Sequence, residues 1–282
     1  TMALHEASPI FFFFFLFSTL PEMTIMRYLL CSLCLCLTIT QATAQILKQE
    51  YYDLTIYRIA NKAQEDQVDH YLKNALLPTL HRAGIRNIGV FKPVEQDSTF
   101  GKRIYVLIPY KNLTLYSEMN DLITIDKAYN EAGKDYLNAP YNQPPYQRME
   151  SILLRTFKGA PALQPSPLTG PRSERVYELR SYESATERIY RNKVNMFVEG
   201  DEVALFKRLG FNAVFYADVL AGGKMPNLMY MTTFANQASR DEHWKAFTDD
   251  AQWKSLKGNP IYQNNISKIT IWFLRPTDYS DY

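Results

Sequence analysis

A nine-residue segment occurs twice in this chain, once in each half. The first copy, residues 49–57, reads QEYYDLTIY, and the second, residues 174–182, reads ERVYELRSY. Both copies place an aromatic residue, an acid, a leucine and a second tyrosine at the same offsets. An internal repeat constrains a fold strongly, because each copy is expected to form the same structural unit. The sequence therefore predicts two related units within one polypeptide.

Hydrophobic spacing gives both halves the same order of elements, namely strand, helix, strand, strand, helix and strand. Residues 51–59 alternate with the period of a strand, and the apolar positions of residues 63–82 follow one face of a helix. Pro78 is expected to kink that helix and Gly84 to end it. The predicted elements are residues 51–59, 63–82, 87–91, 103–110, 112–131 and 151–156 in the first half, and residues 175–182, 185–209, 211–219, 228–234, 236–256 and 267–274 in the second.

This order of elements indicates a split β-α-β unit, in which a four-stranded sheet carries both helices on one face. The other face of each sheet must also be buried, and the second unit offers a matching open face. The predicted fold class is therefore α+β, with two ferredoxin-like repeats packed sheet to sheet as an intramolecular, barrel-like pseudo-dimer.

The start of the chain has the order of a secretory signal. From Met26 the sequence shows a basic residue, Arg27, then an apolar run over residues 28–39, and then an A-T-A triplet that ends at Ala44. This apolar run is too short to span a bilayer. All three cysteines lie inside it, so no disulfide or cysteine metal site is expected after processing. We predict a secreted or periplasmic protein that is cleaved after Ala44, with no stable membrane span afterwards.

Composition shifts along the chain predict the domain boundaries. A segment with four prolines, two glycines and no periodicity separates the two halves, as expected for a semi-extended linker. The predicted parts are residues 1–44 as signal peptide and upstream extension, 45–157 as the first repeat, 158–173 as the linker, and 174–282 as the second repeat.

Several motifs of the second half resemble those of the NIPSNAP family. They are residues 176–182, the R-L-G-F turn at residues 208–211, and a helix with Trp244 and Trp253. The resemblance extends over both repeats as tandem domains of a secreted bacterial type, and it is weaker in the first. It implies the dimeric α+β barrel fold but no particular reaction. Proteins with this barrel include cofactor-free oxygenases, isomerases and haem-binding enzymes.

Three polar residues of the second copy are candidate ligand-binding residues. Glu178, Arg180 and Tyr182 share one strand face by the period of two. If Tyr177 and Leu179 pack under the helices, these three point into the barrel, where an acid, a guanidinium and a phenol could hold a carboxylate or an enolisable ligand. The alternative, which we favour, is a structural network in which Glu178 and Arg180 pair across the repeat interface.

The first copy contributes Asp53 and Tyr57 as the counterparts of Glu178 and Tyr182. Thr55 replaces the arginine, so a two-fold symmetric site is not expected.

No cofactor or metal is expected from the histidines that remain after processing. His70 and His81 are eleven residues apart on one predicted helix, so they cannot meet at one ion. His243 lies on a different helix and has no companion ligand nearby in the sequence.

Charge and motifs narrow the function classes but leave three of them open. The chain has 31 Lys and Arg against 29 Asp and Glu, with no basic run interleaved with aromatic residues, so a nucleic-acid partner is not expected. The favoured function is binding of a small, partly apolar molecule in the barrel. The alternatives are a cofactor-independent oxygenase or isomerase, and a structural or protein-interaction module that exposes the Tyr- and Pro-rich loop at residues 136–146. A homodimer is left open.

Overall fold

The computed structural model describes residues 49–158, 162–163 and 166–282. The predicted signal peptide and its cleavage point lie outside the described residues. None of the helices in the described ranges is long and apolar enough to cross a membrane.

The described residues of each half form four strands. The strands are β1 (Tyr51–Arg58), β2 (Gly89–Pro93), β3 (Arg103–Tyr110) and β4 (Arg148–Thr156) in repeat 1, and β5 (Val176–Glu183), β6 (Asn212–Ala221), β7 (Asn227–Phe234) and β8 (Lys268–Pro276) in repeat 2.

Helical segments follow β1 and β3 in repeat 1, and β5 and β7 in repeat 2. They are α3 (Lys62–Tyr71), the π-helical turn η1 (Leu72–Leu76), α4 (Leu77–Arg82), α5 (Leu113–Thr124), α6 (Lys127–Ala132) and α7 (Lys134–Leu137) in repeat 1, and α8 (Glu187–Val198), α9 (Glu202–Arg208), α10 (Gln237–Asp249), α11 (Ala251–Gly258) and the 3-10 turn η2 (Pro260–Tyr262) in repeat 2.

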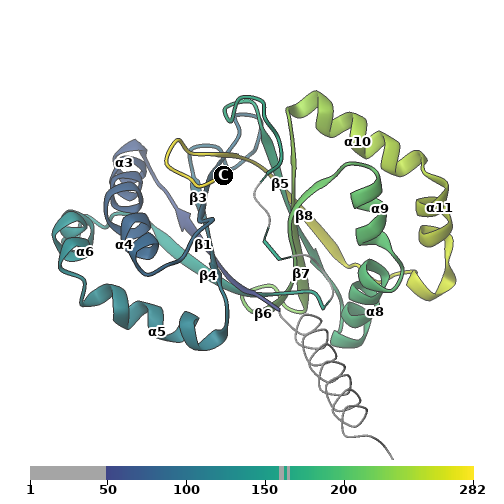
Figure 1. Cartoon of the computed structure of the whole chain (residues 1–282), viewed down its shortest axis with the longest axis horizontal. Coiled ribbons are helices and arrows are strands. Elements are labelled where there is room, and N and C mark those ends of the chain that lie inside the picture. Colours follow the sequence, from purple (N-terminus) through teal and green to yellow (C-terminus); the bar gives the residue numbers. More distant parts are fainter. Residues whose placement is uncertain (1–48, 159–161, 164–165) are drawn as a thin grey trace, which may run out of the picture. The chain divides into compact units, whose positions relative to one another are not determined.

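The eight strands close into a single barrel in the order β1-β3-β2-β8-β5-β7-β6-β4. Within each repeat the order is that of a ferredoxin-like sheet, and the two sheets join edge to edge through antiparallel pairing of β2 with β8 and of β4 with β6. The helices of repeat 1 cover one side of the barrel and those of repeat 2 the opposite side (Figure 1). The predicted α+β pseudo-dimer is therefore confirmed, and pairing of the sheet edges closes it.

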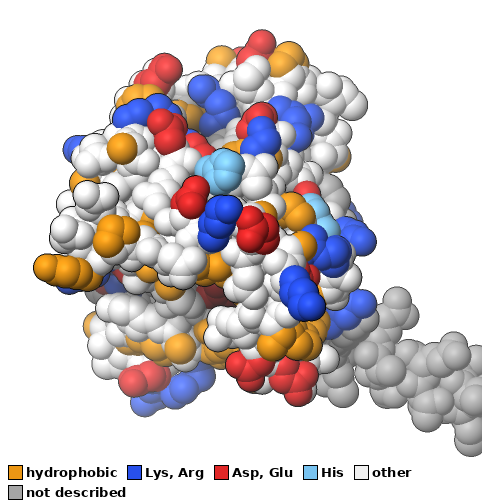
Figure 2. Space-filling model, turned by 90° about the vertical axis from the view of Figure 1, so that its left-hand side faces the viewer, with side chains coloured by type: hydrophobic (Ala, Val, Ile, Leu, Met, Phe, Trp, Pro, Cys, Tyr) orange, Lys and Arg blue, Asp and Glu red, His pale blue; other side chains and the backbone are white. Residues whose placement is uncertain are grey.

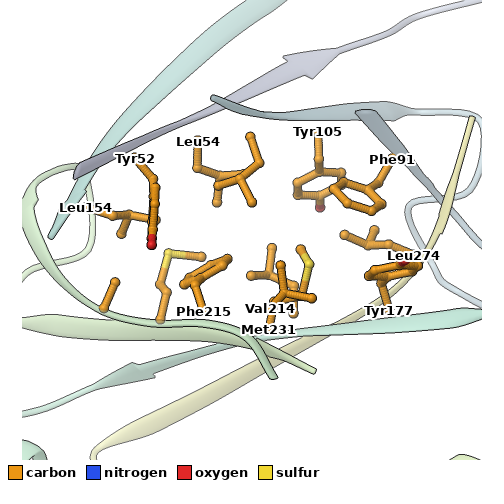
Figure 3. Packing of buried hydrophobic residues seen from close by; sticks show 14 of the residues in the cluster. Tyr52, Leu54, Phe91, Tyr105, Leu154, Tyr177, Val214, Phe215, Met231 and Leu274 are labelled. Carbon is orange, nitrogen blue, oxygen red and sulfur yellow. The ribbon is translucent and has the colours of Figure 1, made fainter. Parts of the chain in front are cut away.

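Large apolar side chains from both repeats fill the inside of the barrel. Tyr52 and Leu54 of β1 face Phe215 of β6 and Tyr177 of β5 across the interior (Figure 3). Two segments that follow β4 and β8 add Leu163 and Tyr282 to the same cluster. Side chains at alternate positions of the same strands point outward and pack beneath the helices.

The first helix follows the predicted stripe. Its predicted apolar positions are all buried, namely Val68, Leu72, Ala75, Leu76 and Leu80. The helix continues through the π-helical turn η1, where Leu77 N donates to Leu72 O, into α4, and Pro78, which has no N–H to donate, lies in the first turn of α4. Gly84 follows with φ of 85°, a conformation that glycine adopts at low cost.

The second helix of each repeat, predicted as continuous, is broken at an aspartate. Asp126 accepts a hydrogen bond from Tyr129 N and begins α6, while Asp250 accepts from Gln252 N and Trp253 N and begins α11. An arginine at the end of the first predicted helix of each repeat pairs with the aspartate, Arg82 of α4 at 2.8 Å and Arg208 of α9 at 2.9 Å. A capping carboxylate ends one helix and starts the next, so the same break occurs in both halves.

Candidate functional site

The predicted orientation of the β5 side chains is wrong. Tyr177 and Leu179 belong to the cluster inside the barrel, whereas Tyr182 packs with the helices of repeat 2. Glu178 hydrogen-bonds to Trp244 of α10. The period of two separates the faces correctly, but both faces of each sheet are buried, so alternation alone could not decide which face meets the helices. The polar face of β5 lies beneath the helices.

Glu178 lies at the centre of a buried network of charged groups. Its Oε1 accepts from Arg180 Nε at 2.6 Å and from Arg240 Nη2 at 2.9 Å, and its Oε2 accepts from Arg240 Nε at 2.8 Å and Trp244 Nε1 at 2.7 Å. The Arg180 guanidinium also lies 3.7 Å from the centre of the Trp244 ring. Glu178 is fully buried. A carboxylate with four donors and no exposure has no free lone pair directed at a substrate, so this geometry suits a structural role better than that of a general base.

The structural alternative predicted that Glu178 and Arg180 pair across the interface between the repeats, and the observed pair differs from this. The two residues lie two positions apart on one strand and reach toward α10, so the pair does not bridge the two repeats. A contact of either residue with a ligand stays a prediction.

Two tyrosines beneath the helices of repeat 2 extend the network. Arg180 Nη1 donates to Tyr182 OH at 3.0 Å, and the hydroxyls of Tyr182 and Tyr230 lie 2.9 Å apart. Burial raises the pKa of Tyr182, and the nearby Arg180 guanidinium partly offsets this. Both phenols are therefore neutral hydrogen-bonding groups at ordinary pH.

The counterparts in repeat 1 form a site without a cation. Asp53 Oδ2 accepts from Thr55 Oγ1 at 2.7 Å and Asp53 Oδ1 from Ser151 Oγ, and these hydroxyls are its side-chain partners in the described part of the chain. Burial raises the pKa of the Asp53 carboxyl. Tyr57 packs against Tyr146 beneath the helices. The arginine-rich network of repeat 2 is therefore not reproduced around Asp53, and the role of Asp53 and Tyr57 in ligand binding stays a prediction.

The Tyr- and Pro-rich loop packs mainly on the helical side of repeat 1. Tyr136 stacks on Tyr71 with ring centroids 3.7 Å apart, whereas Tyr141 is 96% exposed. On the face that carries α3 to α6, acidic and basic side chains are mixed, with hydrophobic side chains between them (Figure 2). The exposed large hydrophobic residues of this half are Phe100, Leu113, Leu122, Ile125, Leu137, Tyr141 and Met149.

The histidines have ordinary polar contacts. His81 Nε2 lies 3.0 Å from Asp281 Oδ2, His70 lies beside Asn74, and His243 Nδ1 bonds to the carbonyl of Ser239. Across residues 49–158, 162–163 and 166–282, no group of three or more His, Cys, Asp or Glu residues has the arrangement of a metal site.

A hollow that no sequence pattern predicted lies at one end of the barrel, and we call it the mouth. It has a volume of about 80 Å³ and lies where β1 and β5 end. Apolar side chains from both repeats line it, together with basic residues, one acid and the buried Ser181–Asn227 pair. The lining includes Ile56, Arg58, Arg103, Glu150, Ile152, Ser181, Val219, Lys224, Asn227, Met229 and Trp272.

The side chains that line the mouth carry a net positive charge. Arg58 forms an ion pair with Glu150, and two further cations, Arg103 and Lys224, line the same hollow. The Lys224 ammonium lies 5.3 Å from the centre of the Trp272 ring. A hollow with an aromatic wall and uncompensated cations can hold an anion that has an apolar part. Gly222 and Gly223 also line this hollow.

The architecture defines the class of protein. A closed eight-stranded barrel built from two ferredoxin-like halves, with helices outside, is a dimeric α+β barrel, made here by one chain. Residues 177–281, which make up most of repeat 2, match the family model described as NIPSNAP. The predicted resemblance is confirmed over this span. A tandem second domain in repeat 1 and a secreted type stay predictions. No curated protein matches the sequence.

Two solved structures with TM-scores above 0.5 agree on the fold. A candidate monooxygenase from Lactobacillus acidophilus NCFM is 12% identical and aligns over 81% of this chain and 94% of its own, with a TM-score of 0.53. A candidate monooxygenase from Fusobacterium nucleatum is 7% identical and aligns over 82% of this chain and 93% of its own, with a TM-score of 0.51. A NIPSNAP family protein from Agrobacterium tumefaciens is 20% identical and covers 42% of this chain and 98% of its own, with a TM-score of 0.34. At these identities the likeness concerns the fold alone.

Proposed function

We propose that this protein binds a small, partly apolar anion at the mouth of its barrel. The observation that carries the proposal is the hollow between Trp272 and Lys224, to which strands of both repeats contribute. Mouths of β-barrels are common positions for ligand sites, and a few charged groups beside an apolar wall give such sites their specificity.

The size of the hollow limits the ligand. About 80 Å³ is less than the roughly 150 Å³ of an engineered cavity that accepts benzene. The mouth therefore takes either a molecule of a few heavy atoms or one end of a longer molecule. Arg103 and Lys224 would supply charge-assisted hydrogen bonds to its anionic group, while Trp272 and Met229 would pack on its apolar part.

Titration with propionate tests this proposal. We expect saturable movement of the Trp272 indole N–H resonance with propionate, and a weaker response with neutral propionamide. The double variant Arg103→Gln/Lys224→Gln should bind propionate about tenfold more weakly, because it loses two cations that would contact the carboxylate.

Removal of two lysines elsewhere provides the matched control. Lys254→Gln/Lys257→Gln changes the net charge equally on α11, outside the mouth, and should leave the propionate affinity unchanged. Equal binding of propionate and propionamide, or equal weakening in both double variants, would contradict a site at the mouth.

We also propose that the protein is exported. Arg27, the apolar residues 28–39 and the triplet that ends at Ala44 support this in sequence. After expression in a bacterium from Met26, N-terminal sequencing of the periplasmic protein should begin at Gln45. Recovery of the uncut chain in the cytoplasm, under conditions in which a known secreted control is processed, would refute it.

A further inference from the structure

A second, larger hollow lies outside the barrel on repeat 1, and we call it the repeat-1 groove. It has a volume of about 380 Å³, within the range of roughly 300–1,000 Å³ that is usual for small-molecule sites. One wall is the loop after α4, with Gly84 and Ile85, and the other is the turn between β3 and α5, with Tyr110 and Lys111. It shares no lining residue with the mouth.

The two repeats differ at this place. Gly84 and Gly210 both follow the first helical segment and both have positive φ. A Cβ atom added at Gly210 would lie 3.2 Å from His243 Nε2, whereas one added at Gly84 would meet nothing within 4 Å. The His243 ring also packs on Phe211 and Phe234, which correspond to Ile85 and Tyr110. Side chains therefore occupy in repeat 2 the space that stays open in repeat 1.

The inner surface of the groove is apolar. Ile85, Tyr110 and Leu163 line it and are each less than a tenth exposed, and Leu115 adds a partly buried side chain. An apolar molecule would gain burial here without displacing a charged group.

The outer edge of the groove is basic. Arg86 Nη1 donates to the carbonyls of His81 and Ile85, which holds the guanidinium in place. In the described residues, neither Arg86 Nε and Nη2 nor Lys111 Nζ donates a hydrogen bond to another group. Glu50 is the acid in the lining, and its Oε2 already accepts from Tyr52 OH at 3.2 Å and Leu163 N at 3.1 Å. The hydrogen-bond donors that remain available at this edge therefore belong to the cations Arg86 and Lys111.

We propose that the repeat-1 groove binds an amphiphilic carboxylate. Its apolar body lies against Ile85, Tyr110 and Leu163, and its carboxylate lies between Arg86 and Lys111. Arginine and lysine both favour carboxylates through charge-assisted hydrogen bonds, and the guanidinium does so with fixed geometry.

Paired probes with and without charge test this site. The purified protein is titrated with 3-phenylpropanoate and with 3-phenylpropanamide, with binding followed by calorimetry and by the resonances of Tyr110 and Trp272. We expect the carboxylate to bind at least tenfold more tightly than the amide, with movement of Tyr110. Arg86→Gln/Lys111→Gln should remove this preference, and Leu115→Trp, which fills the groove, should weaken both probes.

The control is again Lys254→Gln/Lys257→Gln, which removes the same charge from repeat 2 and should retain the preference. Unchanged thermal midpoints separate loss of binding from loss of folding. Equal affinity for the two probes, no saturable binding of either, or movement of Trp272 without Tyr110 would overturn the proposal.

Discussion

Replacement of Glu178 by glutamine should lower the free energy of unfolding by about 3–5 kcal/mol, the usual cost of removing one partner of a buried ion pair. The carboxylate accepts four hydrogen bonds from two arginines and a tryptophan. In the variant, the buried Arg180 would lose its counter-charge, the partly buried Arg240 would keep its pair with Asp241, and the new amide would direct its own donors at both guanidinium groups. Urea denaturation at neutral pH, followed by circular dichroism, measures the difference.

The repeat itself supplies the control. Asp53→Asn makes the same chemical change at the corresponding position, where the donors are the hydroxyls of Thr55 and Ser151. Hydroxyls can also accept from the new amide, so we expect stability within about 1 kcal/mol of the wild type at neutral pH. Equal losses for Glu178→Gln and Asp53→Asn would show that the arginines contribute nothing specific.

The pH dependence of the Asp53 variant has a defined sign. Burial raises the pKa of Asp53 in the folded state above its unfolded value of about 3.9. The folded protein then binds the proton more tightly, so wild-type stability falls as pH rises from about 4 through the folded pKa. Asp53→Asn has no carboxyl to titrate at this position. The stability of the variant relative to the wild type should therefore increase as the pH rises from about 4 through the folded pKa of Asp53.

The Glu178 experiment also separates the two interpretations of β5. A large loss of stability identifies the network as structural. If the unfolding free energy stays unchanged while binding of a small ligand is lost, the ligand-binding interpretation of Glu178, Arg180 and Tyr182 is correct instead.

Local patterns predicted the fold well because each repeat uses standard signals. These signals can be recognised from residues close together in the sequence. They include the alternation in β1 and β5, the helical stripe with Val68 and Leu72, and the helix end at Gly84. Because the nine-residue segment occurs in both halves, the sequence also predicted two similar sheets packed together. Whether the polar face of β5 meets the helices or the barrel interior depends on which elements pack against each face of the sheet. No local pattern of β5 contains that information.

The candidate sites depend on contacts between distant segments. The mouth joins Arg58 and Arg103 of repeat 1 to Lys224 and Trp272 of repeat 2, and the barrel closes only in three dimensions. The groove becomes visible only when the surroundings of Gly84 and Gly210 are compared. A sequence signal did exist for the paired helix breaks, because Arg82 and Asp126 recur as Arg208 and Asp250.

The pair Lys193–Glu202 allows the second large effect to be tested. Lys193 Nζ donates to Glu202 Oε2 at 2.8 Å, and both residues are 2% exposed. The pair spans the break between α8 and α9, beside Asp201 with φ of 60°. Lys193→Met keeps most of the side-chain volume but leaves a buried carboxyl without its partner, so we expect a loss of about 3–5 kcal/mol at neutral pH in urea denaturation.

A double variant distinguishes the cost of an unpaired charge from the value of the pair. Lys193→Met/Glu202→Leu removes both charges, and its stability should return to within about 1 kcal/mol of the wild type or exceed it. Burial raises the pKa of Glu202, so protonation should reduce the deficit of Lys193→Met as the pH falls toward the unfolded value of about 4.3. The exposed pair Lys245–Asp249 on α10 is the control, and Lys245→Met should leave stability unchanged. A double variant as unstable as Lys193→Met alone would show that the ion pair itself, and not relief of an isolated charge, holds α8 against α9.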